Sequence, residues 1–377
     1  MAEDAPDHSP HLLLTAQRLR RLKRDRERQT VRWTNFENRV QSAPDSPERG
    51  FELALYYAVT GNEKRGREAV QWSLAHLCER RQAALVMDWA DALASPDERR
   101  QLRNAACQPD AGSEIERLRN QLFLDISRQK VTDIDEAGKS AVLESIENGK
   151  FADARQLYAA CEYLSAARTN LHVDLREDAK QFFLELPTEF VLALKPEAVE
   201  HPDWTTHIAA LALVALDPNL EGSQYVQGWA MEDRQMIREG RGVAYEFLWA
   251  DPYLPGVGYQ NLDPWVYDSA GRLLARSDWT PNACWIDIST GGVQEENCPP
   301  KWRETVVSFG HLRLVPMTGP CTELPQRKNN ETAIIWRLRP NHSITYVEDK
   351  QQRSAQADTA GLWRAPPNVG GKVCVAR

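Results

Sequence analysis

Apolar and polar positions recur with helical spacing from Ser46 to about Glu239, and this pattern predicts a run of amphipathic helices joined by short turns. Two helix starts carry a hydroxyl residue, a proline and then acids, at Ser46-Pro47-Glu48 and Ser95-Pro96-Asp97-Glu98, which satisfies free N–H groups and suits the helix dipole. Gly61-Asn62 predicts the end of the first of these helices. The later predicted helices are Glu114–Ser127, Glu136–Asn148, Phe151–Thr169, Leu175–Leu194, Trp204–Leu216 and Gln224–Arg238.

Beyond Gly240, Pro, Gly, Asn and Asp become frequent and short alternating segments replace the helical pattern, which predicts β structure. The polar tract Glu348–Thr359 has no apolar periodicity and is expected to be a loop. The predicted strands are Trp265–Tyr267, Leu273–Arg276, Cys284–Ile288, Leu312–Val315, Ala333–Leu338, Ser343–Val347 and Lys372–Val375. The order indicates an α+β multidomain chain: an N-terminal extension over 1–14, a helical domain over 15–248, and an aromatic-rich junction with a short β domain over 249–377.

The net charge of -8 argues against general nucleic-acid binding, for which a positive surplus is expected. The charge is uneven, because Arg18 to Arg32 contains eight basic residues and only two acidic ones. Such a stretch predicts either the solvated outer face of a helix or a surface where a polyanionic glycan docks. No apolar run reaches the ~20 residues of a membrane span, so no membrane partner is expected.

Seven cysteines and the absence of a CxxC motif disfavour zinc ribbons and thioredoxin-like chemistry. The four at Cys284, Cys298, Cys321 and Cys374 suit one or two disulfides in an exported protein, with all three pairings open. No signal segment opens the sequence, and we expect a secreted or periplasmic protein whose signal peptide is absent from this chain.

Four segments resemble a known family: 10–15 (PHLLLT), 58–63 (AVTGNE), 86–90 (VMDWA) and 273–279 (LLARSDW). They are similar to segments of the heparinase II/III-like polysaccharide lyases and their alginate-lyase-like relatives. The resemblance implies an incomplete α/α toroid of antiparallel helices followed by a small antiparallel sheet or sandwich, here shortened. It also implies β-elimination of an acidic, uronate-containing polysaccharide or oligosaccharide without a cofactor. With His311 and His342 isolated in sequence, no metal site is expected.

Removal of a proton beside a uronate carboxylate requires a base, an acid and a cation. Segment 239–245 resembles the catalytic-tyrosine turn of that family, which implies Tyr245 as the acid or base, with Arg241 in the same segment available to lower its pKa. His201 and His207 flank the start of a helix, where either could neutralise the carboxylate or take the proton. The structural alternatives are a half-buried tyrosine that packs the last helix and capping or solvated histidines.

Tryptophan is unusually frequent, with 12 Trp against 9 Phe, and indoles suit both sugar stacking and core packing. The stretch from Trp249 to Trp265 is rich in rings and prolines, which predicts either a groove wall or a plug that seals the domain junction. The predicted substrate-binding residues are Trp204, Trp249, Tyr253, Tyr259, Asn261, Trp265 and Arg276.

The sequence contains no GxxxxGK[ST], GxSxG or HExxH motif, which disfavours ATPases, α/β-hydrolases and zincins. Two alternatives to a lyase stay open. One is a non-catalytic toroid protein that binds a glycan or a protein, and the other is a toroid glycoside hydrolase, for which Asp88 and Asp263 are the first carboxylates to consider.

Overall fold

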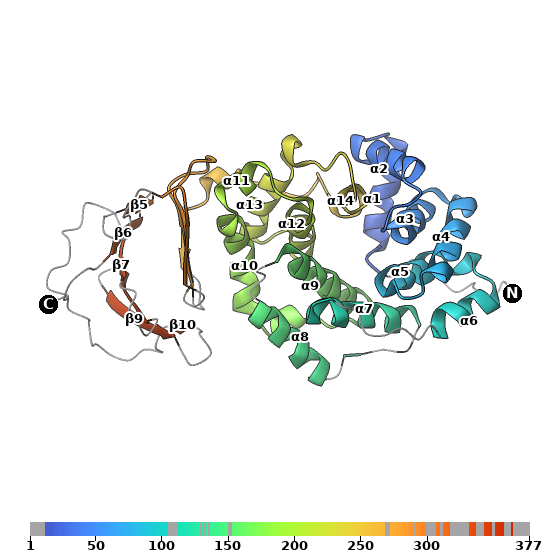
Figure 1. The fold of residues 1–377 in the computed structure, drawn as a ribbon, viewed down its shortest axis with the longest axis horizontal. Coiled ribbons are helices and arrows are strands. Elements are labelled where there is room, and N and C mark those ends of the chain that lie inside the picture. The colour runs from blue at the N-terminus through green and yellow to red at the C-terminus, as the bar shows by residue number, and fades with distance from the viewer. Residues whose placement is uncertain are drawn as a thin grey trace. The chain divides into compact units, whose positions relative to one another are not determined.

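A computed structural model describes residues 12–104, 112–128, 130, 133–134, 136–149, 153–267, 272–289 and 292–298, and the six strand segments 307–309, 312–316, 332–336, 343–348, 351–357 and 363–364. The chain divides into two compact units, each discontinuous in sequence (Figure 1). The first unit contains Met1–Lys180, Trp204–Pro218 and Met236–Leu254, and the second contains Gln181–Asp203, Asn219–Gln235 and Pro255–Arg377.

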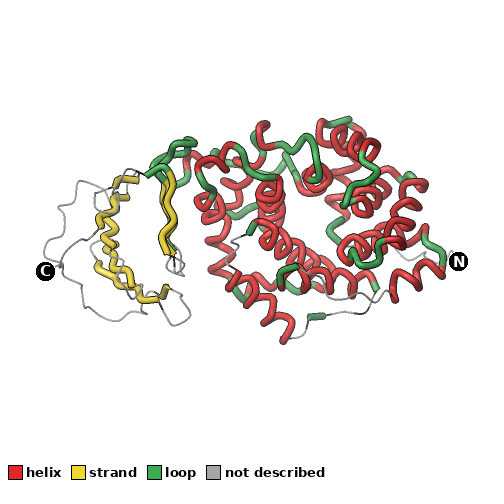
Figure 2. Tube along the Cα trace, viewed as in Figure 1, coloured by secondary structure: helices red, strands yellow, loops and turns green. Residues whose placement is uncertain are grey.

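Helices build the described part of the first unit (Figure 2). They are α1 (Ala16–Glu27), α2 (Val31–Ser42), α3 (Arg49–Thr60), α4 (Glu63–Ala75), α5 (Arg80–Ala90), α6 (Pro96–Asn104), α7 (Glu114–Ser127), α8 (Glu136–Gly149), α9 (Ala154–Ala166), α12 (Trp204–Leu216) and α14 (Gly242–Trp249). Their packing closes on itself, because α3 packs on α5, α5 on α7, α7 on α9, α9 on α12, α12 on α14, α14 on α2, and α2 on α3. This ring is consistent with the predicted α/α toroid.

Several helix boundaries have local causes that the sequence shows. The side chains of Thr15, Thr30 and Asn62 accept hydrogen bonds from the first turns of α1, α2 and α4. Ser113 and Glu116 form a capping box at the start of α7. Gly61 ends α3 with a φ of 73°, a left-handed conformation that costs glycine little, so the predicted end of this helix is confirmed.

Three predictions of secondary structure need correction. The predicted helix Gln224–Arg238 is instead α13 (Glu221–Ala230) followed by a short 3-10 turn (Asp233–Gln235). The predicted helix Leu175–Leu194 is a 3-10 turn (Leu175–Glu177) followed by α10 (Lys180–Ala193). The β region does not begin after Gly240, because α14 follows it and packs on α2 and α12.

In the second unit, α10, α11 (Pro196–Glu200) and α13 accompany a four-stranded antiparallel sheet with strand order β1-β2-β3-β4. The strands are β1 (Trp265–Tyr267), β2 (Leu273–Arg276), β3 (Trp285–Ser289) and β4 (Gly292–Glu296). Leu192 of α10, Leu274 and Trp285 form a buried cluster. The Trp285 indole also donates a hydrogen bond of 2.8 Å to the carbonyl of Leu192, which fixes the sheet on α10.

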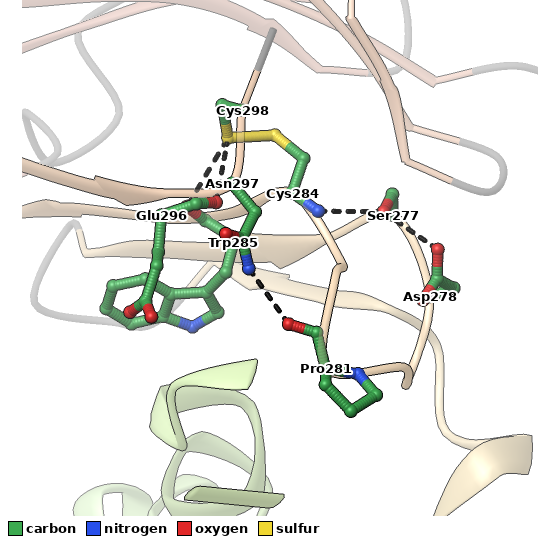
Figure 3. The surroundings of a disulfide bond; sticks show 8 residues. All are labelled: Ser277, Asp278, Pro281, Cys284, Trp285, Glu296, Asn297 and Cys298. Atoms are coloured by element: carbon green, nitrogen blue, oxygen red, sulfur yellow. Dashed lines mark hydrogen bonds between the residues drawn. A yellow bond between two sulfur atoms is a disulfide. The ribbon is translucent and has the colours of Figure 1, made fainter. Parts of the chain in front are cut away.

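A disulfide joins Cys284, just before β3, to Cys298, just after β4 (Figure 3). It is one of the pairings that the sequence left open among the C-terminal cysteines. Asn297 donates a hydrogen bond to the carbonyl of Pro281 beside it. Cys78 is also disulfide-bonded, and Cys161 is a buried free thiol.

Two further three-stranded groups follow: β5 (Val307–Phe309), β6 (Leu312–Pro316) and β7 (Thr332–Trp336), then β8 (Ser343–Glu348), β9 (Gln351–Ala357) and β10 (Trp363–Arg364). The predicted loop Glu348–Thr359 is wrong for most of its length, because β9 pairs antiparallel with β8 there. The predicted strand Lys372–Val375 lies outside the described residues. The order of elements nevertheless confirms the predicted fold class, an antiparallel helical domain followed by a small antiparallel sheet.

Candidate functional site

A buried cluster of charged and phenolic side chains joins three helices of the ring. Arg81 of α5 donates to both carboxylate oxygens of Glu162 in α9, at 2.5 and 2.9 Å. Its third nitrogen, Nη1, donates to the Tyr245 hydroxyl of α14 at 3.1 Å. The Tyr245 hydroxyl donates in turn to Glu48, directly before α3, at 2.7 Å. Since α5, α9 and α14 are not neighbours in the ring, the cluster lies across its interior.

Two further hydrogen-bond donors contact the buried carboxylate of Glu162. Arg119 of α7 donates to Glu162 at 2.7 Å and the Tyr158 hydroxyl donates at 2.5 Å. The Trp249 indole donates to the Tyr158 hydroxyl at 3.0 Å. A buried carboxylate with two guanidinium partners and a phenol donor has its lone pairs satisfied, which is the condition for keeping a charge in the interior.

The protonation states follow from this arrangement. Burial raises the pKa of Tyr245 well above its ordinary value; Arg81 opposes this shift and Glu48 adds to it. Burial also raises the pKa of Tyr158, and Glu162 adds to the shift. For Glu162 burial favours the neutral acid, but Arg81 and Arg119 outweigh it and lower the pKa. At neutral pH the cluster therefore contains a carboxylate and two protonated phenols.

A second buried pair ties α12 to α14. His207 Nε2 lies 2.6 Å from Glu246 Oε2, and both side chains are 1% exposed. Arg32 of α2 donates to the other carboxylate oxygen at 2.7 Å. Burial opposes ionisation of Glu246, but hydrogen bonding to His207 and the charges of His207 and Arg32 lower its pKa overall. The predicted catalytic His207 thus contacts the neighbour of Tyr245 in sequence.

Two other predicted residues, one close to Tyr245 in space and one close to it in sequence, differ in exposure. Trp204, the first residue of α12, is half-buried and its ring lies 5.8 Å from the Tyr245 ring. Arg241 directly precedes α14 and is exposed. The cation at hydrogen-bond distance from the Tyr245 hydroxyl is Arg81, which the sequence did not single out.

Helix α1 covers the end of α14. The Arg18 guanidinium stacks 4.1 Å above the centre of the buried Trp249 ring, and burial with the nearby Arg21 lowers the pKa of Arg18 to about 9. Arg21 donates to the carbonyl of Leu248 at 2.6 Å and pairs with Asp251 at 3.2 Å. Trp249 is therefore a core residue: it is 2% exposed, Arg18 lies over its ring, and its indole N–H is bonded to Tyr158.

The remaining predicted residues, except Tyr253, belong to the second unit. His201 is exposed and ends α11. Tyr259 is buried, accepts a hydrogen bond from Arg234 at 3.1 Å, and packs edge-on against Trp279. Asn261 and Asp263 are exposed and Trp265 is half-buried in β1.

Arg276 is fully buried in the second unit and acts there as a structural side chain. It donates to the carbonyls of Asp278 and Leu194 at 2.8 and 3.3 Å, and its guanidinium stacks 4.2 Å above Trp279. Burial lowers its pKa to about 10. Tyr253, by contrast, belongs to the first unit and is 58% exposed.

Sequence reasoning missed Arg81, Glu48, Glu162 and Tyr158, which surround Tyr245. The one local signal was the four-residue spacing of Tyr158 and Glu162, which places both on one helix face. Asp88 accepts a hydrogen bond from the backbone of Leu12 at 2.7 Å, so it holds the chain ahead of α1. Within the described residues, no group of His, Cys, Asp and Glu side chains has the geometry of a metal site.

The comparisons with known proteins are sparse. No family model and no curated protein matches the sequence. Among solved structures, the fold is similar to that of a mutant of the heparan sulfate lyase HepC from Pedobacter heparinus, with a TM-score of 0.39 and 14% identity. The alignment covers 81% of this chain and 58% of that chain. A likeness this distant carries no information on activity or substrate. Separately, no described helix combines the length and apolar character that a membrane crossing needs.

Proposed function

We propose that the chain is a polysaccharide lyase-like protein that cleaves an acidic, uronate-containing polysaccharide by β-elimination at Tyr245. The resemblance of the sequence to heparinase II/III-like lyases suggests the reaction. The observation that carries the proposal is the Tyr245 hydroxyl, held between the Arg81 guanidinium at 3.1 Å and the Glu48 carboxylate at 2.7 Å.

The protonation state of Tyr245 favours an acid over a base. Because its pKa is raised, the phenol keeps its proton until the leaving oxygen of the sugar develops charge. Glu48 is the most open member of the cluster, with 23% of its side chain exposed, and we assign it as the base. His207 is less suited to that role because Glu246 holds its Nε2 in the interior. We assign His207 to positioning α14 instead.

The proposed reaction balances without a cofactor. Glu48 takes the proton beside the uronate carboxylate, the electron pair of that C–H bond forms the new double bond, and the glycosidic C–O bond breaks. Tyr245 gives its proton to the leaving oxygen and recovers one from Glu48 through their hydrogen bond. Arg241 lies four residues before Tyr245, about 6 Å along the helix axis, where an exposed cation can neutralise the uronate carboxylate. The Trp204 ring lies beside Tyr245, and a sugar ring would stack on it.

The test is a screen of heparin, alginate, hyaluronan and pectate for the absorbance of a newly formed unsaturated uronate. Tyr245→Phe, which removes only the hydroxyl, and Glu48→Gln should each lower the rate about 10²- to 10⁴-fold. Tyr56→Phe is the matched control, since this phenol also donates to a carboxylate, Glu37 at 3.1 Å, outside the cluster around Tyr245, and the rate should be unchanged. If the parent protein produces no absorbance change with any of the polyuronates, or if Tyr245→Phe keeps full activity, the proposal is refuted.

A second candidate, a glycan-binding protein without catalysis, is favoured by one observation. Tyr245 is 5% exposed and His207 is 1% exposed, so both side chains have little surface open to a substrate. A glycan-binding protein of this kind should bind a polyuronate without forming product, and Trp204→Ala should weaken that binding. New reducing ends without the chromophore would indicate a toroid glycoside hydrolase instead. The Cys284–Cys298 disulfide supports our further proposal that the chain functions in an oxidising, secreted or periplasmic setting.

A further inference from the structure

The outer face of α1 carries a row of cations. Arg20, Lys23 and Arg24 are spaced three and four residues apart, so they share one face of the helix, and all three are exposed. The opposite face, with Arg21, Leu22 and Asp25, is buried. The predicted basic stretch therefore divides into an inner set that packs the protein and an outer set that meets solvent.

The outer set differs from the inner set in its partners. Among the described residues, no acidic side chain pairs with Arg20, Lys23 or Arg24, whereas Arg21 pairs with Asp251. Only Glu27 adds a negative charge to this face. Like charges at these spacings repel one another and destabilise the helix. A bound polyanion would relieve that repulsion.

An exposed ring continues the row. Arg28, which ends α1, donates to the Tyr253 hydroxyl at 2.8 Å, and Tyr253 is 58% exposed. At 1.5 Å per residue, Arg20 and Arg28 are separated by about 12 Å along the helix. The surface thus presents spaced cations that end in an exposed aromatic ring, which suits a short charged sugar chain.

We propose that this surface, which we call the α1 face (Arg20, Lys23, Arg24, Arg28 and Tyr253), binds a densely anionic polysaccharide apart from the Tyr245 site. The choice of a polysaccharide rests on the proposed function. Single-stranded nucleic acid fits less well, because its non-specific binding sites offer several stacking rings in succession and the α1 face offers one.

The test measures affinity for heparin oligosaccharides, the probe, by calorimetry over a range of salt concentrations. The triple variant Arg20→Ala, Lys23→Ala and Arg24→Ala should bind at least about tenfold more weakly, with the salt slope reduced by about 2 to 3. The matched control removes three exposed cations elsewhere in the same unit, Lys64→Ala, Arg100→Ala and Arg103→Ala, and should keep both the affinity and the slope. Tyr253→Ala should weaken binding and leave the slope unchanged.

The outcomes separate this inference from the proposed function. Equal losses in the two triple variants would overturn it, because net charge alone would then explain binding. Tighter binding of oligodeoxythymidine than of heparin would overturn the choice of polysaccharide. If no polyuronate is cleaved while the α1 variant alone loses heparin affinity, the proposed function fails and the α1 face stands. The melting temperature of each variant confirms that it is folded.

Discussion

Glu162→Gln tests whether the buried charge cluster stabilises the helical ring. The substitution keeps the shape of the side chain and removes its charge, which leaves Arg81 and Arg119 in the interior without their shared carboxylate. Glu162 is fully buried, so water cannot readily solvate the two guanidinium groups once the carboxylate is removed. We therefore expect a large loss of stability in the first unit.

The magnitude follows from the desolvation of unpaired charges. Breaking a buried ion pair by removing one partner typically costs about 3 to 5 kcal/mol. For a unit of about 200 residues, each kcal/mol shifts Tm by about 2 to 4 °C, so the expected fall in Tm is on the order of 10 °C. The pH dependence should change as well. Because the folded pKa of Glu162 is lowered, its contribution is present above the unfolded pKa and is lost as pH falls through the folded value, so the variant should lose less stability in acid.

The control is Glu98→Gln, which also removes a carboxylate that accepts two hydrogen bonds from one arginine. Hydrogen bonds from Arg67 lower the pKa of Glu98 to about 2. However, the Arg67 side chain is 43% exposed, so water screens the pair and we expect a cost below about 1 kcal/mol. Thermal unfolding followed by circular dichroism between pH 3 and 8 measures both variants. Equal Tm losses, or an unchanged acid dependence in Glu162→Gln, would refute the assignment of stability to burial of the ion pair.

Three further predictions concern stability and use the same unfolding assay. Replacing Cys284 and Cys298 by Ala should destabilise the second unit by about 3 kcal/mol, because the disulfide closes a loop of 14 residues; an unchanged Tm would contradict this. Gly228→Ala should cost about 3 kcal/mol, because the new Cβ would lie 1.9 Å from the backbone oxygen of Val257, which cannot rotate away; an unchanged Tm would show that the two segments do not pack this closely. Asp25→Asn should be neutral or stabilising at pH 7, because burial raises the pKa of Asp25 and the parent therefore loses stability as pH rises through that folded pKa; a clear loss at pH 7 would contradict this sign.

The parts of the fold that the sequence predicted are those with local causes. Ser95 caps the start of α6 by accepting a hydrogen bond from the backbone of Glu98, and Gly61 ends α3 through its backbone freedom. The other predicted cap, Ser46, is wrong, because α3 begins at Arg49 without a side-chain cap. The missed elements have non-local causes. Helix α14 begins at Gly242, two residues after Gly240, and is stabilised by packing on α2 and α12. Strand β9 has no apolar alternation, and its pairing with β8 comes from the backbone.

The candidate site also depends on contacts between residues that are far apart in the sequence, which sequence patterns do not reveal. The expectation that Tyr245 pairs with an arginine was sound chemistry, but nearness in sequence suggested Arg241. The arginine bonded to the phenol is Arg81, 164 residues away in the chain. Periodicity places Arg81 on a helix without showing which helix faces it, because that depends on how the ring closes. The partners of a buried group are therefore the part of a site that a single sequence reveals least.

The arginines of α1 show why one charged stretch can have two functions. A guanidinium that leaves water must find an acid or a carbonyl, or the unpaired charge would destabilise the fold. Arg21 meets this demand with Asp251 and the carbonyl of Leu248, so it contributes to structure. Arg20 and Arg24 stay hydrated on the other face, and nothing in folding requires them to be paired. In a chain with net charge -8, cations left exposed and unpaired are those that can still meet an external anion, and burial rather than sequence position distinguishes the two sets.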